Sequence, residues 1–188
     1  MTKKIVNGLD MQQMQAMIDA VKKQPQAFKV MFHAKVTWKS GFYTEASVKD
    51  FTVGGTKNTT SRAKPFTVPQ DRPLEFGGTN KGASAGELLL ATLGHCITSG
   101  FAPAGAVMGI PIESLTAEVE GDIDPQGMLG LPKPGAVRPG FQEIRARYYV
   151  KSKATREQLE KVAKMAEDLS PVKDSLRAVK FSSQLFVQ

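Results

Sequence analysis

The sequence is poor in the residue types that most often hold metals and form redox centres. Among its 188 residues there are one cysteine, Cys96, and two histidines, His33 and His95. A single cysteine excludes an intramolecular disulfide, a cysteine-based zinc site and a CxxC redox motif. Two histidines leave little for a histidine metal site, so we expect neither a metal nor another cofactor. The scarcity of cysteine favours a reducing compartment, and we predict a cytoplasmic protein.

Signals of export and of membrane insertion are also lacking. Residues 1–15 contain two lysines with no apolar run behind them, which does not resemble a secretory signal. Residues 88–112 carry no formal charge and are long enough to span a bilayer. They contain prolines, glycines and hydroxyl residues, however, and the lysines expected at one end of a membrane span are missing. We therefore expect a helix buried on all sides in a protein core, which suggests an oligomer.

Basic residues outnumber acidic ones by 25 to 18, which gives a formal net charge of +7. Such a charge permits an anionic partner. The lysines and arginines are scattered as singles and pairs, and the sequence has no RNP or zinc-finger motif. We expect a solvated basic surface without nucleic-acid binding, and a steep salt dependence of DNA binding would be needed to revive that alternative.

Apolar spacing predicts one mixed domain of helices and strands. Helical spacing runs from Asp10, a candidate N-cap, to Lys23. Alternation of apolar and polar residues predicts strands over 28–38, 42–53, 65–68, 112–121, 141–151 and 179–187, the first two forming a hairpin that a polar loop at 57–61 follows. A last helix is capped by Thr155 with Gln158 and stops at Ser170, before a proline. This order predicts an α+β fold with mostly antiparallel pairing.

The uncharged helix follows a loop rich in proline and glycine, PQDRPLEFGGTNKGA. Ser84 is a good N-cap, and Glu87 completes the S-x-x-E capping box. The helix is expected to bend or end near Pro103, because proline cannot donate a helical hydrogen bond. A second loop of this composition, residues 122–140, is long enough to be functional or mobile.

Cys96 has two interpretations from its position alone. A lone cysteine in an apolar helix is usually a small core residue. A reactive thiol instead needs a nearby cation or a helix N-terminus. Cys96 lies about three turns inside the helix, and His95 points about 100° away from it. An activating group must therefore come from another chain or from the preceding loop, where the candidates are Arg62, Arg72 and Glu75.

Three segments together resemble the OsmC/Ohr family. They read PLEFGGTNKGASAGELLLATLGHC, IESLTAEVEGD and VRPGFQEIRARYYVKSKATREQLEKVAKMAEDLSPV. The resemblance extends over about residues 28–187, so that residues 1–27 form an N-terminal helical extension and residues 28–188 an OsmC-like domain. It implies an OsmC/Ohr-like α+β fold with antiparallel sheets around a buried central helix, in which two chains intertwine as a homodimer.

The resemblance also implies a chemistry. Family members that reduce organic hydroperoxides use two cysteines: the first, on the central helix, attacks the peroxide, and the second, before a proline, resolves the sulfenic acid as a disulfide. An arginine and a glutamate hold the first thiol as thiolate. Cys96 matches the first cysteine, whereas Ser170 stands in place of the second. The family motif Asn-Pro-Glu reads Ser84-Ala85-Gly86 in this chain, so the usual glutamate is missing.

Two functions follow from this partial match. The first is a thiol protein of oxidative-stress defence that reduces organic hydroperoxides through Cys96 alone. It needs an external thiol reductant, because serine cannot form a disulfide and an unresolved sulfenic acid risks over-oxidation. The second is a non-catalytic dimer, structural or binding a small apolar molecule, with an unreactive Cys96 beside an apolar cavity. The position of the family's arginine can fall on Lys39, Arg62 or Arg72, depending on how the segments align. We take Arg72 and Glu75 as the neighbours of the thiolate.

Overall fold

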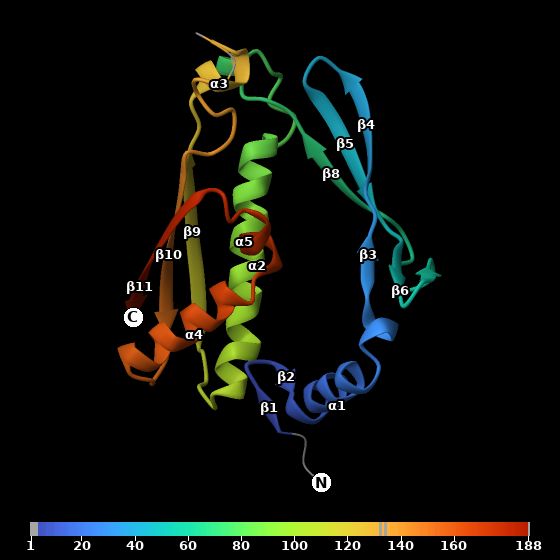
Figure 1. Cartoon of the computed structure of the whole chain (residues 1–188), viewed down its shortest axis with the longest axis vertical. Helices are drawn as coiled ribbons and strands as arrows, with labels where there is room; N and C mark the ends of the chain where they lie inside the picture. Colours follow the sequence, from blue (N-terminus) through green and yellow to red (C-terminus); the bar gives the residue numbers. More distant parts are fainter. Residues whose placement is uncertain (1–3, 132, 134, 188) are drawn as a thin grey trace. The chain divides into compact units, whose positions relative to one another are not determined.

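The computed structural model describes residues 4–131, 133 and 135–187, and these residues form two compact units. Unit 1 comprises the described residues of Met1–Met11 and Leu89–Gln188, and unit 2 comprises Gln12–Leu88. Figure 1 shows the elements of both units coloured along the chain. The predicted division between residues 27 and 28 refers to the extent of the family resemblance and stays a prediction.

Unit 1 is built on a three-stranded sheet with the order β11–β10–β9. Its strands are β9 (Ser114–Asp122), β10 (Glu143–Lys151) and β11 (Lys180–Val187). β9 and β10 are antiparallel, whereas β10 and β11 are parallel. A parallel neighbour needs a crossover connection, which α4 (Arg156–Asp168) and α5 (Pro171–Ser175) supply. The expected α+β fold with mostly antiparallel strands is confirmed, and β11 is the exception.

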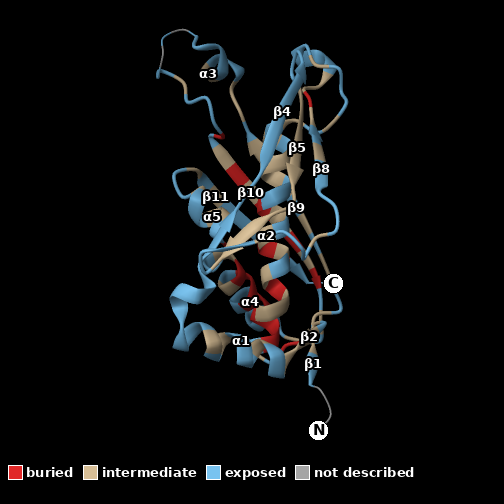
Figure 2. Cartoon of the chain, turned by 90° about the vertical axis from the view of Figure 1, so that its right-hand side faces the viewer, coloured by how far each residue is buried: buried red, intermediate tan, exposed pale blue. Residues whose placement is uncertain are grey.

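The core of unit 1 lies between one face of this sheet and two helices. Along β10 every second residue is buried, including Ile144, Tyr148 and Val150. α2 (Ala85–Val107) and α4 cover this face with apolar side chains that are at most 7% exposed: Leu93, Ile97, Phe101, Leu159, Val162, Ala163 and Ala166. Phe101 meets Tyr148 edge to face, with ring centroids 5.3 Å apart. Figure 2 shows the buried residues concentrated on α2, β10 and α4.

Two features of α2 refine the sequence prediction. The helix continues through Pro103 to Val107, because a proline removes only one hydrogen bond from the helical ladder. It is also not buried on all sides of this chain: one face packs in the core, while Ala91, Thr92 and His95 are exposed. By length and composition α2 could cross a membrane, but its buried face belongs to the core described above.

The C-terminal end of α2 is held by the N-terminal hairpin of β1 (Ile5–Val6) and β2 (Leu9–Asp10). The amide of Asn7, in the hairpin turn, donates to the carbonyls of Ala102 and Ile110 and accepts from the N–H of Ile112. Gly105 lies beneath it, and a Cβ there would come within 2.8 Å of the Asn7 side-chain nitrogen. The β1–β2 hairpin therefore stabilises the end of α2 and the approach to β9 through Asn7.

Unit 2 contains α1 (Met11–Lys23, which starts at the unit boundary), two small antiparallel sheets and two 3-10 turns, η1 (Pro25–Phe28) and η2 (Leu74–Phe76). Their strand orders are β3–β6–β7 and β4–β5–β8. The strands are β3 (Val30–Phe32), β4 (Lys35–Ser40), β5 (Tyr43–Val48), β6 (Phe51–Val53), β7 (Thr56–Asn58) and β8 (Phe66–Gln70).

The predicted helix to Lys23, the β4–β5 hairpin and the short third strand are confirmed. Four details of the sequence prediction were wrong. The strand over 42–53 is broken into β5 and β6, because residues 49–50 leave one sheet before the other begins. The strand over 28–38 is broken into η1, β3 and β4, because residues 33–34 leave one sheet before the other begins. Part of the polar loop at 57–61 belongs to β7, which its hairpin with β6 stabilises. Within 122–140 there is a short helix, α3 (Pro125–Leu129), capped by Asp124; residues 132 and 134 lie outside the described residues.

Large apolar side chains on the strands of unit 2 are exposed. Phe32 is 76% exposed, Trp38 68% and Val36 63%. Asp71 is the single buried residue among Gln12–Leu88, all of which are described. Three-stranded sheets need a buried apolar face for independent stability, so the strands of unit 2 lack a core of their own in a single chain.

Leu159 tests the core of unit 1. It is 0% exposed, so we expect Leu159→Ala to lower the free energy of unfolding by about 2–5 kcal/mol through lost burial and a residual cavity. The matched control is Leu129→Ala, at a leucine that is 68% exposed, with an expected change below about 0.5 kcal/mol. Urea denaturation measures both, and equal losses in the two variants would contradict the assignment of the core.

Candidate functional site

The structure brings Cys96 and Ser170 together, although 74 residues separate them in the sequence. The hydroxyl of Ser170 donates a hydrogen bond to the sulfur of Cys96, at 3.1 Å. Cys96 lies on α2 and is partly exposed, whereas Ser170 is only 3% exposed. The residue that stands in place of the expected second cysteine is therefore in direct contact with the first.

A second helix start places the Ser170 hydroxyl. Ser170 is the N-cap of α5, and its Oγ accepts a hydrogen bond from the backbone N–H of Lys173 at 3.1 Å. The N–H of Ser170 itself donates to the carbonyl of Glu167. The sequence predicted the stop at Ser170 but not α5, because a single helical turn carries no apolar periodicity.

The side chains around this turn hold one another in place. The ammonium of Lys173 pairs with Glu167 at 3.2 Å and lies 5.0 Å from the centre of the Phe181 ring. The Glu167 side chain is only 12% exposed. Lys173 also borders a cavity of about 330 Å³ whose apolar lining residues are Leu93, Ile144, Leu176, Val179 and Phe181. Both ends of α5 are thus tied to the core that carries Cys96.

Arg72 and Glu75, the predicted neighbours of the thiolate, belong to the loop of unit 2 that precedes α2. The guanidinium of Arg72 lies 4.0 Å from the centre of the Phe42 ring. Glu75 is exposed on η2. Cys96 belongs to unit 1, so the role of these two residues stays a prediction. The other candidates have partners within unit 2: Arg62 donates to the carbonyl of Lys49 at 3.0 Å, and Lys39 pairs with Glu45 at 2.8 Å.

Asp71 organises this loop, and sequence reasoning missed it. The side chain is 1% exposed and accepts from the N–H groups of Arg72, Thr79 and Lys81 and from the Thr79 hydroxyl. The Thr79 hydroxyl above all, together with the three N–H groups, lowers the pKa of Asp71 to about 2 although burial opposes this. No sequence pattern distinguishes such an aspartate from a solvated loop charge, because its partners are defined by the folded loop.

The same loop explains its glycine pair. Gly77 has a φ of +76°, which favours glycine. Gly78 lies directly against the backbone of Arg72, where a Cβ would come within 1.8 Å of the carbonyl oxygen. The backbone before η2 therefore packs closely against the backbone after it. The Asp71 side chain connects the two by accepting from the N–H of Arg72 on one side and that of Thr79 on the other.

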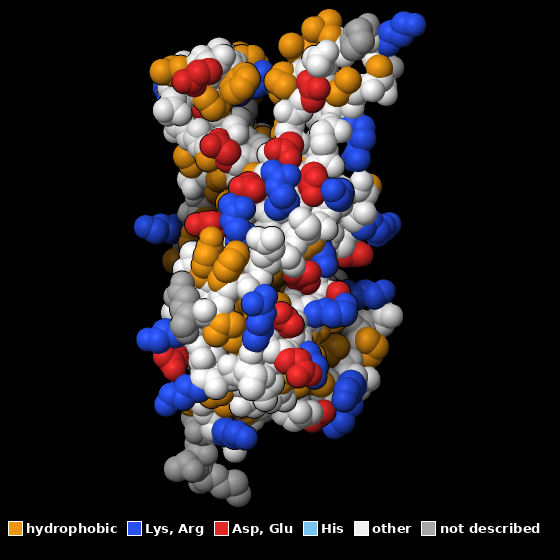
Figure 3. Space-filling view, turned by 90° about the vertical axis from the view of Figure 1, so that its left-hand side faces the viewer, with side chains coloured by type: hydrophobic (Ala, Val, Ile, Leu, Met, Phe, Trp, Pro, Cys, Tyr) orange, Lys and Arg blue, Asp and Glu red, His pale blue; other side chains and the backbone are white. Residues whose placement is uncertain are grey.

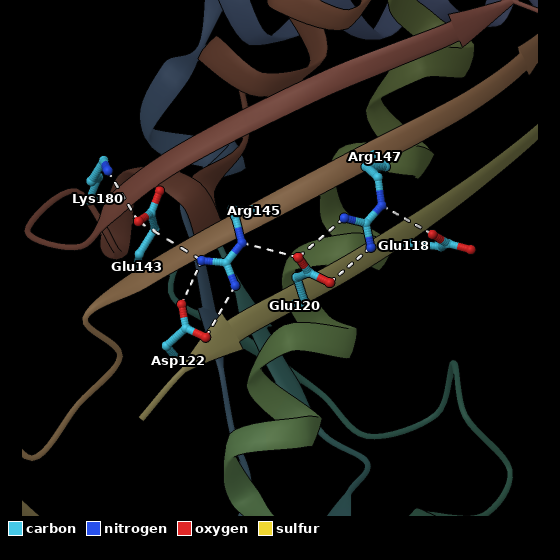
Figure 4. A network of polar contacts seen from close by, with 7 residues as sticks. All are labelled: Glu118, Glu120, Asp122, Glu143, Arg145, Arg147 and Lys180. Atoms are coloured by element: carbon cyan, nitrogen blue, oxygen red, sulfur yellow. Dashed lines mark hydrogen bonds and ion pairs between the residues drawn. The ribbon is translucent and has the colours of Figure 1, made fainter. Parts of the chain in front are cut away.

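The outer face of the unit 1 sheet carries a ladder of opposite charges (Figure 4). Arg147 pairs with Glu120 at 2.8 Å, and Arg145 bridges Glu120 and Asp122. Arg147, and then Arg145, lower the pKa of Glu120 to about 2. These groups are a third or more exposed, with the side chain of Glu120 at 46%, so each pair contributes little to stability. The ladder balances the charge of this face and offers no free cation cluster.

Neither charge nor metal chemistry points to another site in the described residues. Figure 3 shows acidic and basic side chains interleaved on the face that it presents. Among residues 4–131, 133 and 135–187, no group of three or more histidine, cysteine, aspartate or glutamate side chains could hold a metal ion. The Cys96–Ser170 pair is therefore the candidate with a defined chemistry.

Comparison with known proteins identifies the fold. The family model for OsmC-like protein matches residues 78–184, more than half of the chain, and includes both Cys96 and Ser170. The structure of an OsmC-like protein from Mycoplasma pneumoniae superimposes with a TM-score of 0.64 at 16% identity, covering 84% of this chain and 96% of that one. An OsmC-like protein of unknown function from Vibrio cholerae gives a TM-score of 0.61 at 16% identity, covering 83% and 99%.

A third similar structure is that of an organic hydroperoxide resistance protein OsmC from Legionella pneumophila. It gives a TM-score of 0.55 at 14% identity, covering 85% of this chain and 99% of that one. No curated protein sequence matches the chain significantly. At such identities the structural likeness establishes the fold.

Asp71 predicts a local acid sensitivity. The unfolded carboxyl takes up its proton near pH 3.8 and the folded one only near pH 2, so the loop is fully stabilised above about pH 4 and loses this stabilisation as the pH falls toward 2. We expect the exchange protection of the Thr79 and Lys81 amides to fall over that range. In Asp71→Asn the protection should be roughly tenfold lower at neutral pH and flat across the range.

Amide hydrogen exchange, corrected for the intrinsic rate at each pH, measures this effect. Glu75→Gln, which removes an exposed carboxylate from the same loop, is the matched control and should behave as the unmodified protein. An acid-dependent loss of protection that persists in Asp71→Asn would contradict the prediction.

Proposed function

Because the chain belongs to the OsmC-like protein family, we propose that it is a thiol protein of oxidative-stress defence that reduces organic hydroperoxides with Cys96 alone. The observation that carries this proposal is the 3.1 Å contact between the Cys96 sulfur and the Ser170 hydroxyl. A thiol that takes part in a reaction at a site needs polar neighbours that hold its sulfur in place. Cys96 has such a neighbour and is partly exposed, unlike a cysteine that only fills a core.

The proposed reaction has two stages. The Cys96 thiolate attacks the terminal oxygen of the hydroperoxide, an S–O bond forms, and the O–O bond breaks. The leaving alkoxide takes up a proton to become an alcohol, and the sulfur, oxidised by two electrons, becomes a sulfenic acid. An external thiol then displaces water to form a mixed disulfide, and a second thiol releases Cys96 and leaves with the first as a disulfide.

The reductant and the thiolate's neighbours follow from the residues present. Ser170 cannot form a disulfide, so the proposed partner is an external thiol, which places the reaction in a reducing compartment, the cytoplasm. We retain Arg72 and Glu75 as proposed neighbours of the thiolate, since a guanidinium favours the ionised sulfur. The fixed loop around Asp71 supports this assignment, because it gives both residues a defined backbone.

The exposed strands of unit 2 support a homodimer. Phe32, Val36 and Trp38 together present apolar surface of the kind that marks protein interfaces. The exposed face of α2 is uncharged over residues 88–107, so it also suits burial. We propose that a second copy of this chain covers these surfaces, because the charge-free segment and the coreless strands occur in the same chain and each needs a partner.

A non-catalytic binding function is the alternative, and one observation favours it. The cavity of about 330 Å³ beside α5 is large enough for a small molecule and has five apolar side chains in its lining. Glu167, Asp168, Lys173, Asp174 and Arg177 complete that lining, however, which makes the cavity less suited to a purely apolar ligand.

Intact mass after brief treatment with an organic hydroperoxide tests the reaction. We expect rapid addition of one oxygen atom to the protein, reversed by a dithiol and absent from Cys96→Ser. That variant also controls for the eight methionines, whose oxidation a dithiol does not reverse. Slow or absent oxidation, at concentrations that oxidise free cysteine, would reject the peroxidase and favour the binding function.

Trp38 tests the dimer. Sedimentation should show a dimer, and Trp38→Lys should raise its dissociation constant at least about tenfold, because a desolvated charge at an interface costs more than 1.4 kcal/mol. Thr37→Lys is the matched control, since adjacent strand residues point to opposite faces. A monomer at micromolar concentration, or equal effects of the two variants, would contradict the proposed interface.

A further inference from the structure

The hydroxyl of Ser170 has one proton and two lone pairs, and the structure shows the partners of the proton and of one lone pair. One lone pair accepts from the N–H of Lys173, and the proton is directed at the sulfur of Cys96. A hydrogen bond to an ionised acceptor is roughly twice as strong as one between neutral groups. The contact therefore places a hydrogen-bond donor where the sulfur of Cys96 would react.

We propose that Ser170 is a positioning residue, which holds the Cys96 thiolate for attack on the hydroperoxide and then holds the sulfenic acid until an external thiol arrives. This inference rests on the proposed function. In this proposal Ser170 holds the sulfur of Cys96 by a hydrogen bond, whereas a cysteine at the same position would form a disulfide with it.

The surroundings of Ser170 prevent the hydroxyl from turning away. The residue is 3% exposed, so its proton has no competing solvent acceptor. Pro171 at the first position of α5 fixes the backbone that follows. Lys173, whose N–H engages the hydroxyl, is itself held by Glu167 and lies over the Phe181 ring. A donor fixed in this way loses little entropy when the charge forms on sulfur.

The same geometry defines the state after oxidation. The Ser170 oxygen cannot join the sulfur in a bond that a thiol would reduce, so the sulfenic acid persists next to a hydroxyl. Its oxygen or its sulfur can accept the hydrogen bond that the Ser170 hydroxyl donates to the thiolate. The intermediate is then released only by the external thiol of the proposed cycle.

The test compares the rates of two reactions at Cys96: alkylation by iodoacetamide and oxidation by an organic hydroperoxide. Ser170→Ala removes the donor, and we expect both rates to fall roughly tenfold. Ser170→Thr keeps a hydroxyl and should restore both rates to within about threefold of the unmodified protein. Ser175→Ala is the matched control, because Ser175 lies on the same helix and donates to the Pro171 carbonyl instead.

A separate variant distinguishes this role from that of a helix cap. Ser170→Asp can still accept from the N–H of Lys173 but brings no proton donor to the sulfur. We expect it to keep α5 and yet react at least as slowly as Ser170→Ala. Thermal unfolding followed by circular dichroism reports the stability of each variant. A fast Ser170→Asp, or a slow Ser175→Ala, would show that only the helix matters and would overturn the inference.

The outcomes for the inference and for the proposed function are distinct. Unchanged alkylation in Ser170→Ala overturns the inference, whatever the hydroperoxide does. Suppose that Ser170→Ala is alkylated slowly and that the hydroperoxide oxidises neither the unmodified protein nor any variant. This result would support the contact and reject the peroxidase. If Ser170→Ala does not fold, Ser170→Cys replaces it: with oxygen atom and sulfur 3.1 Å apart, the new thiol should form a disulfide with Cys96 under a mild oxidant. Failure to form that disulfide overturns the inference as well.

Discussion

The packing of two helices on one face of β10 fixes the position of everything else in unit 1. Ile144, Tyr148 and Val150 form that face, and it is buried by α2, which precedes β10 in the sequence, and by α4, which follows it. Because both helices are held against the same strand, the end of α4 comes beside the middle of α2. A contact across 74 residues carries a loop-closure entropy that a single hydrogen bond cannot offset. The Cys96–Ser170 pair is thus a consequence of the apolar core, which supplies the needed free energy.

Local sequence features predicted the elements well, and long-range features did not. The capping boxes of Ser84 with Glu87 and of Thr155 with Gln158 are both present, since each depends on residues three apart. α5 could not be predicted, because a five-residue helix has no apolar periodicity. The burial of Asp71 could not be predicted either, because its hydrogen-bond donors come together only when the loop folds. The family resemblance placed Ser170 where a second cysteine would stand. Its contact with Cys96 could be found only in the folded structure.

The charge-free segment 88–112 shows what an absence of charge indicates about a helix. The absence of charge indicated burial, and one face of α2 is buried in the core of its own chain. The other face is exposed at Ala91, Thr92 and His95. Small and uncharged residues on an exposed helix face bring no gain in solvation, but they allow close packing. Sequence composition reports the environment of a side chain in the assembled protein, whereas the burial seen in one chain reports only its own fold.

Replacing a resolving sulfur by a hydroxyl changes what controls the reaction. With two cysteines, the second thiol reacts at a rate set by its fixed proximity, independent of outside reductant. In the proposed reaction, the sulfenic acid beside Ser170 would disappear only as fast as an external thiol meets it, so turnover would follow the reductant concentration. A hydroxyl that holds the sulfenic acid without reacting lengthens its lifetime, which increases the exposure of Cys96 to a second oxidation. The proposed site therefore needs a thiol that the hydroperoxide can reach but that is not freely exposed, and Cys96 is partly buried beside the nearly fully buried Ser170.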